Sequence, residues 1–139
     1  MFRLCLIVLA VGAPVFAVAQ SEISVAEKIE AAKQEYKQAA VLGFKCSYDQ
    51  IVSAGESSPA TDLVKRVQGI VSSCQQRCVD KYDISFAGRK CQIAAMRGQC
   101  VFLADKGRYE APCIELREDE REVDSAHQDV MALMAMASQ

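Results

Sequence analysis

The chain has 139 residues, with 16 basic and 18 acidic side chains and a formal net charge of −2. Because nucleic-acid-binding domains carry a clear basic excess, this balance argues against a nucleic-acid partner. The length suits a single domain.

The first nineteen residues are typical of a secretory signal peptide. Arg3 gives a basic start, residues 4–16 form an apolar run, and residues 17–19 (Ala-Val-Ala) match a small-x-small cleavage site. A membrane anchor is the alternative, but it requires about 20 apolar residues. We therefore expect residues 1–19 to be removed, leaving residues 20–139 as one helical, disulfide-bonded domain. The protein would then be secreted or periplasmic and would not span a membrane.

Residues 24–42 are predicted to form an amphipathic helix. Ser24 and Glu27 have the spacing of a capping box, and Gly43 is a suitable C-terminal stop. Residues 47–58 are then expected to be a connection, because glycine, serine and proline gather near its end. The apolar stripe of the helix consists of Val25, Ile29, Ala32, Tyr36 and Ala39.

A second helix is expected to begin with Ser58 as its cap and Pro59 at its first position. Residues 82–88 interrupt the helical pattern, and a third helix is expected from about residue 88 to 104. Its apolar residues cover much of the circumference, so this helix should be the most enclosed, with a possible bend at Gly98. The predicted buried face of the second helix consists of Leu63, Val67, Ile70, Cys74 and Cys78.

The last helix is predicted to open at Pro112, after a turn at residues 105–108. No stretch of useful length alternates apolar and polar residues with a period of two, so no sheet is expected. The predicted fold class is therefore all-α: a small disulfide-stapled array of about four antiparallel helices. The expected buried face of the last helix consists of Leu116, Val123, Val130 and Met134.

Six cysteines remain after signal removal, and an even number in a short exported chain predicts a disulfide framework. Two pairs have twelve intervening residues and straddle a turn, where positions equidistant from the turn of a helical hairpin face each other. Six cysteines permit 15 pairings, among which sequence alone does not decide. The preferred pairs are Cys46–Cys74, Cys78–Cys91 and Cys100–Cys113.

Part of this cysteine spacing resembles the insect odorant-binding proteins, which are exported six-cysteine helical chains. Cys46, then 27 residues, then Cys74-x3-Cys78 is similar to the first half of that pattern, and the gap from Cys91 to Cys100 is similar to its final gap. The order departs from the family, which has a long gap after its third cysteine and ends on its eight-residue gap. Here only twelve residues separate Cys78 from Cys91, and Cys113 is added after the gap from Cys91 to Cys100. The resemblance implies an exported helical fold, and the ligand function of the family is not carried over.

Charge is unevenly distributed along the chain. Residues 61–109 carry nine basic and four acidic side chains, whereas residues 110–139 carry two basic and eight acidic ones. We expect the acidic last helix to pack beside the basic middle of the chain and neutralise it. An exposed basic binding face is the alternative.

Catalytic chemistry is not expected. His127 is the only histidine, and every mature cysteine is expected to be bonded, so neither a thiol nucleophile nor a histidine-rich metal cage is available. No nucleophile elbow or phosphate-binding loop occurs. The carboxylates of residues 115–124, next to Arg117 and Arg121, indicate a solvated helix face with ion pairs four residues apart. We expect no enzymatic activity and no cofactor.

By elimination, we expect an exported, non-enzymatic binding protein that recognises another protein, as an inhibitor, an immunity-type factor or an accessory factor. The alternative is a carrier of a small apolar ligand. Protein recognition predicts a filled core and an apolar or charged patch outside, whereas the carrier predicts a closed apolar cavity.

A weaker alternative concerns the end of the last helix. His127, Met131 and Met134 share one face, with Met136 nearby, and imidazole and thioether groups suit Cu(I) or Ag(I). The same residues are more simply explained as a buried face, since methionine is an adaptable core residue.

Overall fold

The computed structural model describes residues 23–57, 60–108 and 111–139. The expected signal peptide and the expected start of the second helix at Ser58 and Pro59 therefore lie outside the described residues. Four helices make up the described chain, which contains no strand: α1 (Val25–Ser57), α2 (Ala60–Tyr82), α3 (Phe86–Asp105) and α4 (Ala111–Ala137). This confirms the predicted all-α array of four helices.

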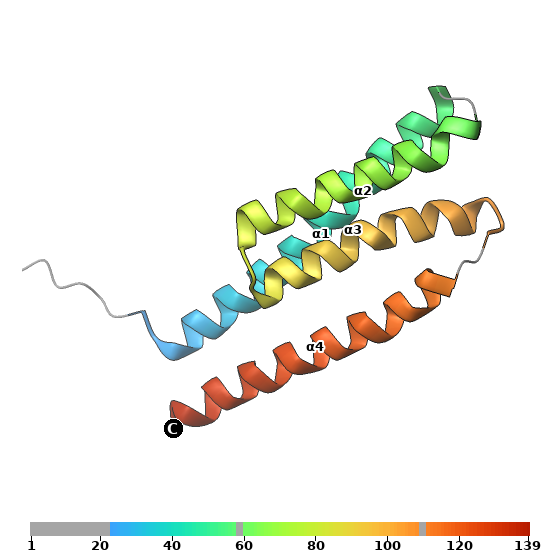
Figure 1. Ribbon diagram of the computed structural model, residues 1–139. Helices are drawn as coiled ribbons and strands as arrows, with labels where there is room; N and C mark the ends of the chain where they lie inside the picture. The colour runs from blue at the N-terminus through green and yellow to red at the C-terminus, as the bar shows by residue number, and fades with distance from the viewer. Residues whose placement is uncertain (1–22, 58–59, 109–110) are drawn as a thin grey trace, which may run out of the picture.

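Each helix runs antiparallel to the one before it in the chain (Figure 1). α1 and α3 form the most extensive helix pair, α2 packs against both, and α4 packs against α3 and, to a lesser extent, α1. Within the described ranges, α2 and α4 do not touch each other. α3 therefore has a neighbour in every other helix, as expected from its apolar circumference.

All three expected disulfides are present. Cys46–Cys74 joins α1 to α2, Cys78–Cys91 joins α2 to α3, and Cys100–Cys113 joins α3 to α4. Every helix is thus covalently fixed to its predecessor. Cys91 and Cys100 face opposite sides of α3, because nine residues correspond to about two and a half helical turns.

The end of α1 differs from the prediction. The expected capping box forms, with the Ser24 amide donating to Glu27 Oε2 at 2.9 Å and the Glu27 amide donating to Ser24 Oγ at 3.2 Å. The helix does not stop at Gly43, however, and the predicted connection over residues 47–58 was wrong, since α1 continues to Ser57.

Gly43 is instead a point of close helix contact. A Cβ atom there would overlap the carbonyl oxygen of Cys91, so glycine lets the backbones of α1 and α3 approach each other. Gly98 does the same from α3, where a Cβ would overlap Ser47 Oγ. α3 is continuous through Gly98, and the contact gives this glycine a packing role.

The core is divided into three clusters along α1 and α3. The predicted α2 face is buried at Val67, Cys74 and Cys78, with Val71 beside it. Leu63 and Ile70 are half-buried. The clusters consist of Ala39, Cys78, Tyr82, Ala87 and Cys91; of Tyr36, Ile93, Leu116 and Val123; and of Ile51, Val67, Val71 and Phe102.

The buried face of α4 also differs from the prediction. Leu116 and Val123 are buried as expected, but the face continues through His127 and Met131, and Val130 and Met134 are only half-buried. α3 begins only at Phe86, whose ring meets His127, whereas Met131 lies opposite residues of α1.

Candidate binding groove between α1 and α4

A buried lysine joins α3 to α4. The Nζ atom of Lys90 donates to Glu120 Oε1 at 2.6 Å and to Asp124 Oδ1 at 2.7 Å. Arg97, also on α3, forms a second ion pair with Glu120. These contacts agree with the expectation that the acidic last helix neutralises basic residues of the middle of the chain. Glu120 and Asp124 are therefore not the solvated, intrahelical pairs that the sequence suggested.

Tyr36 of α1 completes this network. Its hydroxyl donates to Asp124 Oδ1 at 2.6 Å, and the Lys90 ammonium lies 5.4 Å from the centre of its ring. Burial and the interaction with Asp124 raise the pKa of Tyr36 well above its ordinary value. Burial alone would raise the pKa of Asp124, but the hydrogen bonds from Lys90 and Tyr36 and the charges of Lys90 and Arg97 outweigh it and lower the pKa. The phenol thus remains a donor and the carboxylate an acceptor near neutral pH.

His127 also packs against Tyr36. The two rings are stacked with centroids 4.0 Å apart and planes 6° from parallel, and Phe86 meets the imidazole edge-on at 5.8 Å. Burial lowers the pKa of His127, and the charges of Lys33 and Lys90 add to this effect against the opposing charge of Asp124. The imidazole is therefore mainly neutral at pH 7.

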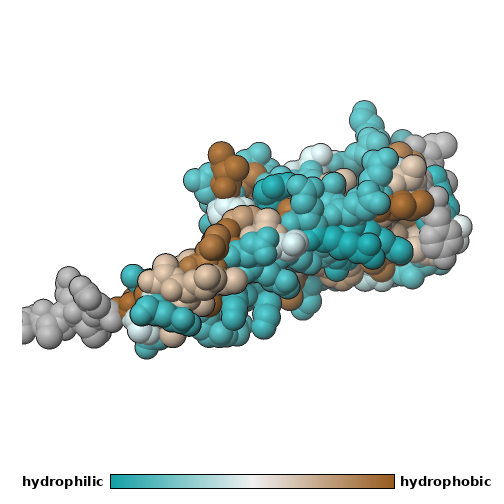
Figure 2. Space-filling model, turned by 90° about the horizontal axis from the view of Figure 1, so that it is seen from below, coloured by the Kyte–Doolittle hydropathy of each residue, from teal (hydrophilic) through white to brown (hydrophobic). Residues whose placement is uncertain are grey.

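An open groove of about 830 Å³ lies above these residues, between the N-terminal half of α1 and the C-terminal half of α4. We refer to it as the α1–α4 groove. Tyr36, Asp124 and His127 contribute to its floor. Figure 2 shows apolar residues gathered at the end of the molecule where the C-terminal part of α4 lies, whereas much of the remaining face is hydrophilic. The apolar walls consist of Ile29, Ala40, Val41, Met131, Ala132 and Ala135.

Two lysines on α1 give the groove a cationic rim. Lys33 and Lys37 both line it and are exposed to solvent. Neither forms an ion pair with any residue of the described ranges. They are four residues apart and so lie on the same side of the helix, one turn from each other.

The residues considered for soft metal binding are only partly brought together. His127 and Met131 are buried and line the α1–α4 groove, whereas Met134 is half-buried and Met136 is exposed, and neither lines it. No group of three or more His, Cys, Asp or Glu side chains within the described chain is arranged to hold a metal ion.

Sequence reasoning did not identify the Tyr36–Asp124–Lys90 network. The sequence pattern places Tyr36 in an apolar stripe and Asp124 on a solvated face. The one available signal was the opposite net charge of residues 61–109 and residues 110–139. It predicted that α4 would pair with basic residues, but it did not identify those residues.

No protein-family model, curated protein or solved structure matches this chain. Among the described helices, none has the length and apolar character needed to cross a membrane. The site must therefore be interpreted from its own geometry.

Proposed function

We propose that the protein is a non-enzymatic binding protein of an oxidising compartment outside the cytoplasm, and that it recognises another protein by binding an acidic amphipathic helix in the α1–α4 groove. The principal support is the combination of apolar walls with two lysines on one rim that form no ion pair with any described residue. The three disulfides are consistent with an oxidising location.

The dimensions of the groove favour a helix as the occupant. Its α1 wall runs from Ile29 to Val41, which corresponds to about 18 Å or three helical turns at 1.5 Å per residue. Ala40, Ala132 and Ala135 have small side chains, so a third helix could approach at the usual interaxial distance of about 8–10 Å. An apolar face with a three- and four-residue repeat would fill the walls.

The charge of the rim favours acidic residues on the partner. Carboxylates one helical turn apart would lie opposite Lys33 and Lys37, and opposite charges at a rim increase the association rate and suppress wrong partners. A basic helix would instead be repelled by the same two ammonium groups.

A carrier of a small apolar ligand has less support. α1 and α3 meet backbone to backbone at Gly43 and Gly98, so no ligand fits between them at these points. The α1–α4 groove is open to solvent, whereas a carrier is expected to enclose its ligand. Metal binding also has less support, because only His127 and Met131 of the proposed ligands line the groove.

A displayed library of three-turn amphipathic helices, with either acidic or basic flanks, would test this proposal on the oxidised protein. We expect selection to enrich acidic flanks, and Ala132→Arg, which fills the groove, to weaken binding of the selected peptides at least about tenfold. Ala31→Arg is the matched control, because Ala31 is exposed on α1 and does not line the groove. Enrichment of basic flanks, or equal binding by the wild type and Ala132→Arg, would contradict the proposal.

A further inference from the structure

A second groove, between α1 and α2, leads to a disulfide. We refer to it as the α1–α2 groove, and Val41, Leu42 and Tyr82 form its apolar part. Cys46 also lines it and is half-buried, whereas its partner Cys74 is only 1% exposed and does not line it. A molecule in the groove therefore meets Cys46, whereas Cys74 is shielded from it.

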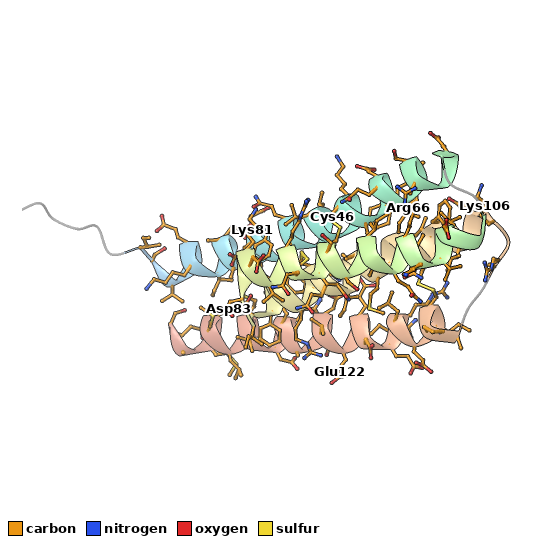
Figure 3. All side chains as sticks on the ribbon, turned by 45° about the horizontal axis from the view of Figure 1, so that its top comes forward. Cys46, Arg66, Lys81, Asp83, Lys106 and Glu122 are labelled. Atoms are coloured by element: carbon orange, nitrogen blue, oxygen red, sulfur yellow. A yellow bond between two sulfur atoms is a disulfide. The ribbon has the colours of Figure 1, made fainter. Side chains whose placement is uncertain are left out.

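The α1–α2 groove is strongly cationic. Lys37 and Lys45 of α1 and Arg77 and Lys81 of α2 line it, with Asp49 as the one carboxylate among its lining residues. Figure 3 places Cys46 and Lys81 on the same side of the molecule, away from Glu122 of α4. All of its lining residues belong to α1 and α2, so the acidic helix α4 does not line this groove.

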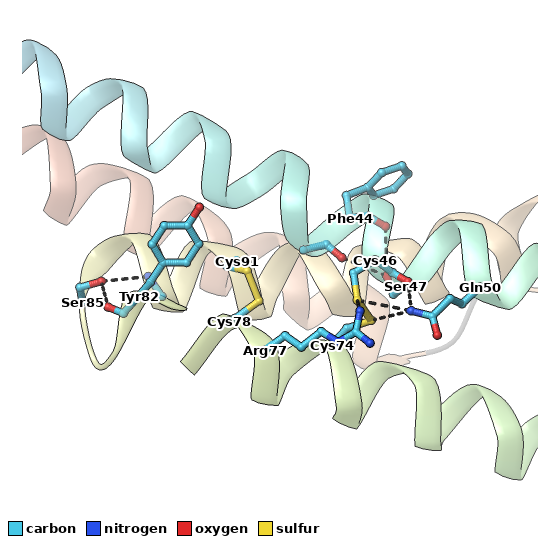
Figure 4. Close-up of a disulfide and its surroundings, with 12 residues drawn as sticks. Phe44, Cys46, Ser47, Gln50, Cys74, Arg77, Cys78, Tyr82, Ser85 and Cys91 are labelled. Atoms are coloured by element: carbon cyan, nitrogen blue, oxygen red, sulfur yellow. Dashed lines mark hydrogen bonds between the residues drawn. A yellow bond between two sulfur atoms is a disulfide. The ribbon is translucent and has the colours of Figure 1, made fainter. Parts of the chain in front are cut away.

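Two side-chain N–H donors lie beside the Cys46–Cys74 disulfide. Gln50 Nε2 lies 3.5 Å from both Cys46 Sγ and Cys74 Sγ, and Arg77 Nη1 lies 3.9 Å from Cys46 Sγ (Figure 4). Thiol–disulfide exchange develops negative charge on the attacking and leaving sulfurs. The Arg77 guanidinium would attract an incoming thiolate, and the Gln50 amide would stabilise a thiolate on Cys74.

We propose that Cys46–Cys74 is a thiol–disulfide exchange site for small thiols that carry carboxylates, of the glutathione class. The thiolate attacks Cys46 Sγ and forms a new sulfur–sulfur bond, while the Cys46–Cys74 bond breaks and its electron pair passes to Cys74 Sγ. The Cys74 thiolate accepts the Gln50 N–H and then a proton from water. The product is a mixed disulfide on Cys46 and a buried Cys74 thiol. When Cys74 gives its proton back to water, its thiolate can attack Cys46 Sγ, restore the Cys46–Cys74 bond and release the bound molecule as a thiolate.

The other two disulfides provide internal comparisons. Both sulfurs of Cys78–Cys91 belong to residues that are 1% exposed or less, so this bond should not react while the protein is folded. Cys100 and Cys113 are both half-buried, so their bond is a possible competitor, and peptide mapping distinguishes it from Cys46–Cys74.

The test uses the folded, oxidised protein with glutathione as the anionic thiol, 2-mercaptoethanol as the neutral one and cysteamine as the cationic one, at equal thiolate concentrations. Timed alkylation and peptide mapping then give the rate at each disulfide and the position of each adduct. We expect glutathione to attach to Cys46 and to react faster than cysteamine there. Raising the salt concentration should reduce this difference, because the attraction is between exposed charges.

The variant Arg77→Gln/Lys81→Gln should lower the glutathione-to-cysteamine rate ratio at Cys46 about threefold or more, because two exposed cations leave the groove. Lys65→Gln is the matched control, since Lys65 is an exposed cation of α2 that does not line the groove, and it should leave the ratio unchanged. Circular dichroism would verify that the variants fold. Glutathione on Cys74, an unchanged ratio in the double variant, or reaction at Cys100–Cys113 with Cys46–Cys74 intact would overturn the proposal.

Discussion

The ring of Tyr36 in α1 is stacked on the imidazole of His127 in α4, with their centroids 4.0 Å apart. This contact lies far from the disulfide Cys100–Cys113, which holds the opposite end of α4. α4 is therefore fixed covalently near its start and by a stacked pair and a hydrogen-bonded network near its middle. The second attachment also sets the position of the α4 wall of the proposed binding groove.

Tyr36→Phe should test the hydrogen bond of this network while preserving the stacked ring. The change removes the hydroxyl that donates to Asp124 at 2.6 Å, and loss of a hydrogen bond to a charged group costs about 1.5–3 kcal/mol. We expect a loss of about 1.5 kcal/mol in the free energy of unfolding, measured by urea titration. Tyr48→Phe is the matched control, because the Tyr48 hydroxyl makes only a long, exposed bond of 3.4 Å to Asp105 and should change stability by less than about 0.5 kcal/mol.

Lys90→Met should be more harmful than Tyr36→Phe. The methionine nearly preserves the apolar stem of the lysine but leaves Glu120 and Asp124 without their shared cation. Removing one partner of a buried ion pair costs about 3–5 kcal/mol, and the 40% exposure of the Asp124 side chain reduces this to about 2–3 kcal/mol. Chemical unfolding would measure the loss. Lys65→Met is the control, because it changes an exposed lysine. If the two variants were equally stable, the ion pairs of Lys90 would make no net contribution to the free energy of unfolding.

Acidification should destabilise the protein first through His127. Its pKa is lowered in the folded state, so below its ordinary value of 6.5 the unfolded chain binds more protons, and stability falls as the pH decreases through this range. The pKa of Asp124 is also lowered, from 3.8, so its contribution is lost only at more acidic pH. Tyr36 has the opposite sign: its pKa is raised, and its contribution is lost as the pH rises above 10.

His127→Phe should remove the loss of stability that protonation of His127 causes on acidification. Phenylalanine can still stack on Tyr36 but cannot be protonated, and the chain has no other histidine. Melting temperatures of the wild type should fall between about pH 7 and about pH 5.5, and those of the variant should change less. Parallel curves for the two proteins would show that the protonation of His127 is not linked to folding.

The cysteines carried most of the information that could be extracted from the sequence. Equal spacing across two turns predicted Cys78–Cys91 and Cys100–Cys113, because positions equidistant from a tight turn must face each other in a helical hairpin. Cys46–Cys74 followed by elimination. These pairings correctly placed consecutive helices side by side, and the charge distribution correctly predicted acidic contacts between α4 and the basic residues of α3.

Contacts between distant segments could not be predicted in the same way. Tyr36 and Asp124 are 88 positions apart, and no local pattern links a tyrosine in an apolar stripe to one of many carboxylates on another helix. Gly43 was misinterpreted for a related reason. A glycine that ends a helix and a glycine that admits a neighbouring helix have the same local sequence signal, and only the position of α3 distinguishes them.

Two glycine substitutions should therefore have opposite effects. In Gly43→Ala the new Cβ would overlap backbone atoms of Cys91, which cannot rotate away, so α1 and α3 must separate, at a cost of about 1–3 kcal/mol. Gly69 lies inside α2, and a Cβ added there would meet no atom within 4 Å, so Gly69→Ala should stabilise the protein by about 0.5–1 kcal/mol through helix propensity. Thermal and urea unfolding of both variants would measure the difference. If Gly43→Ala were as stable as Gly69→Ala, the close backbone contact between α1 and α3 at Gly43 would be contradicted.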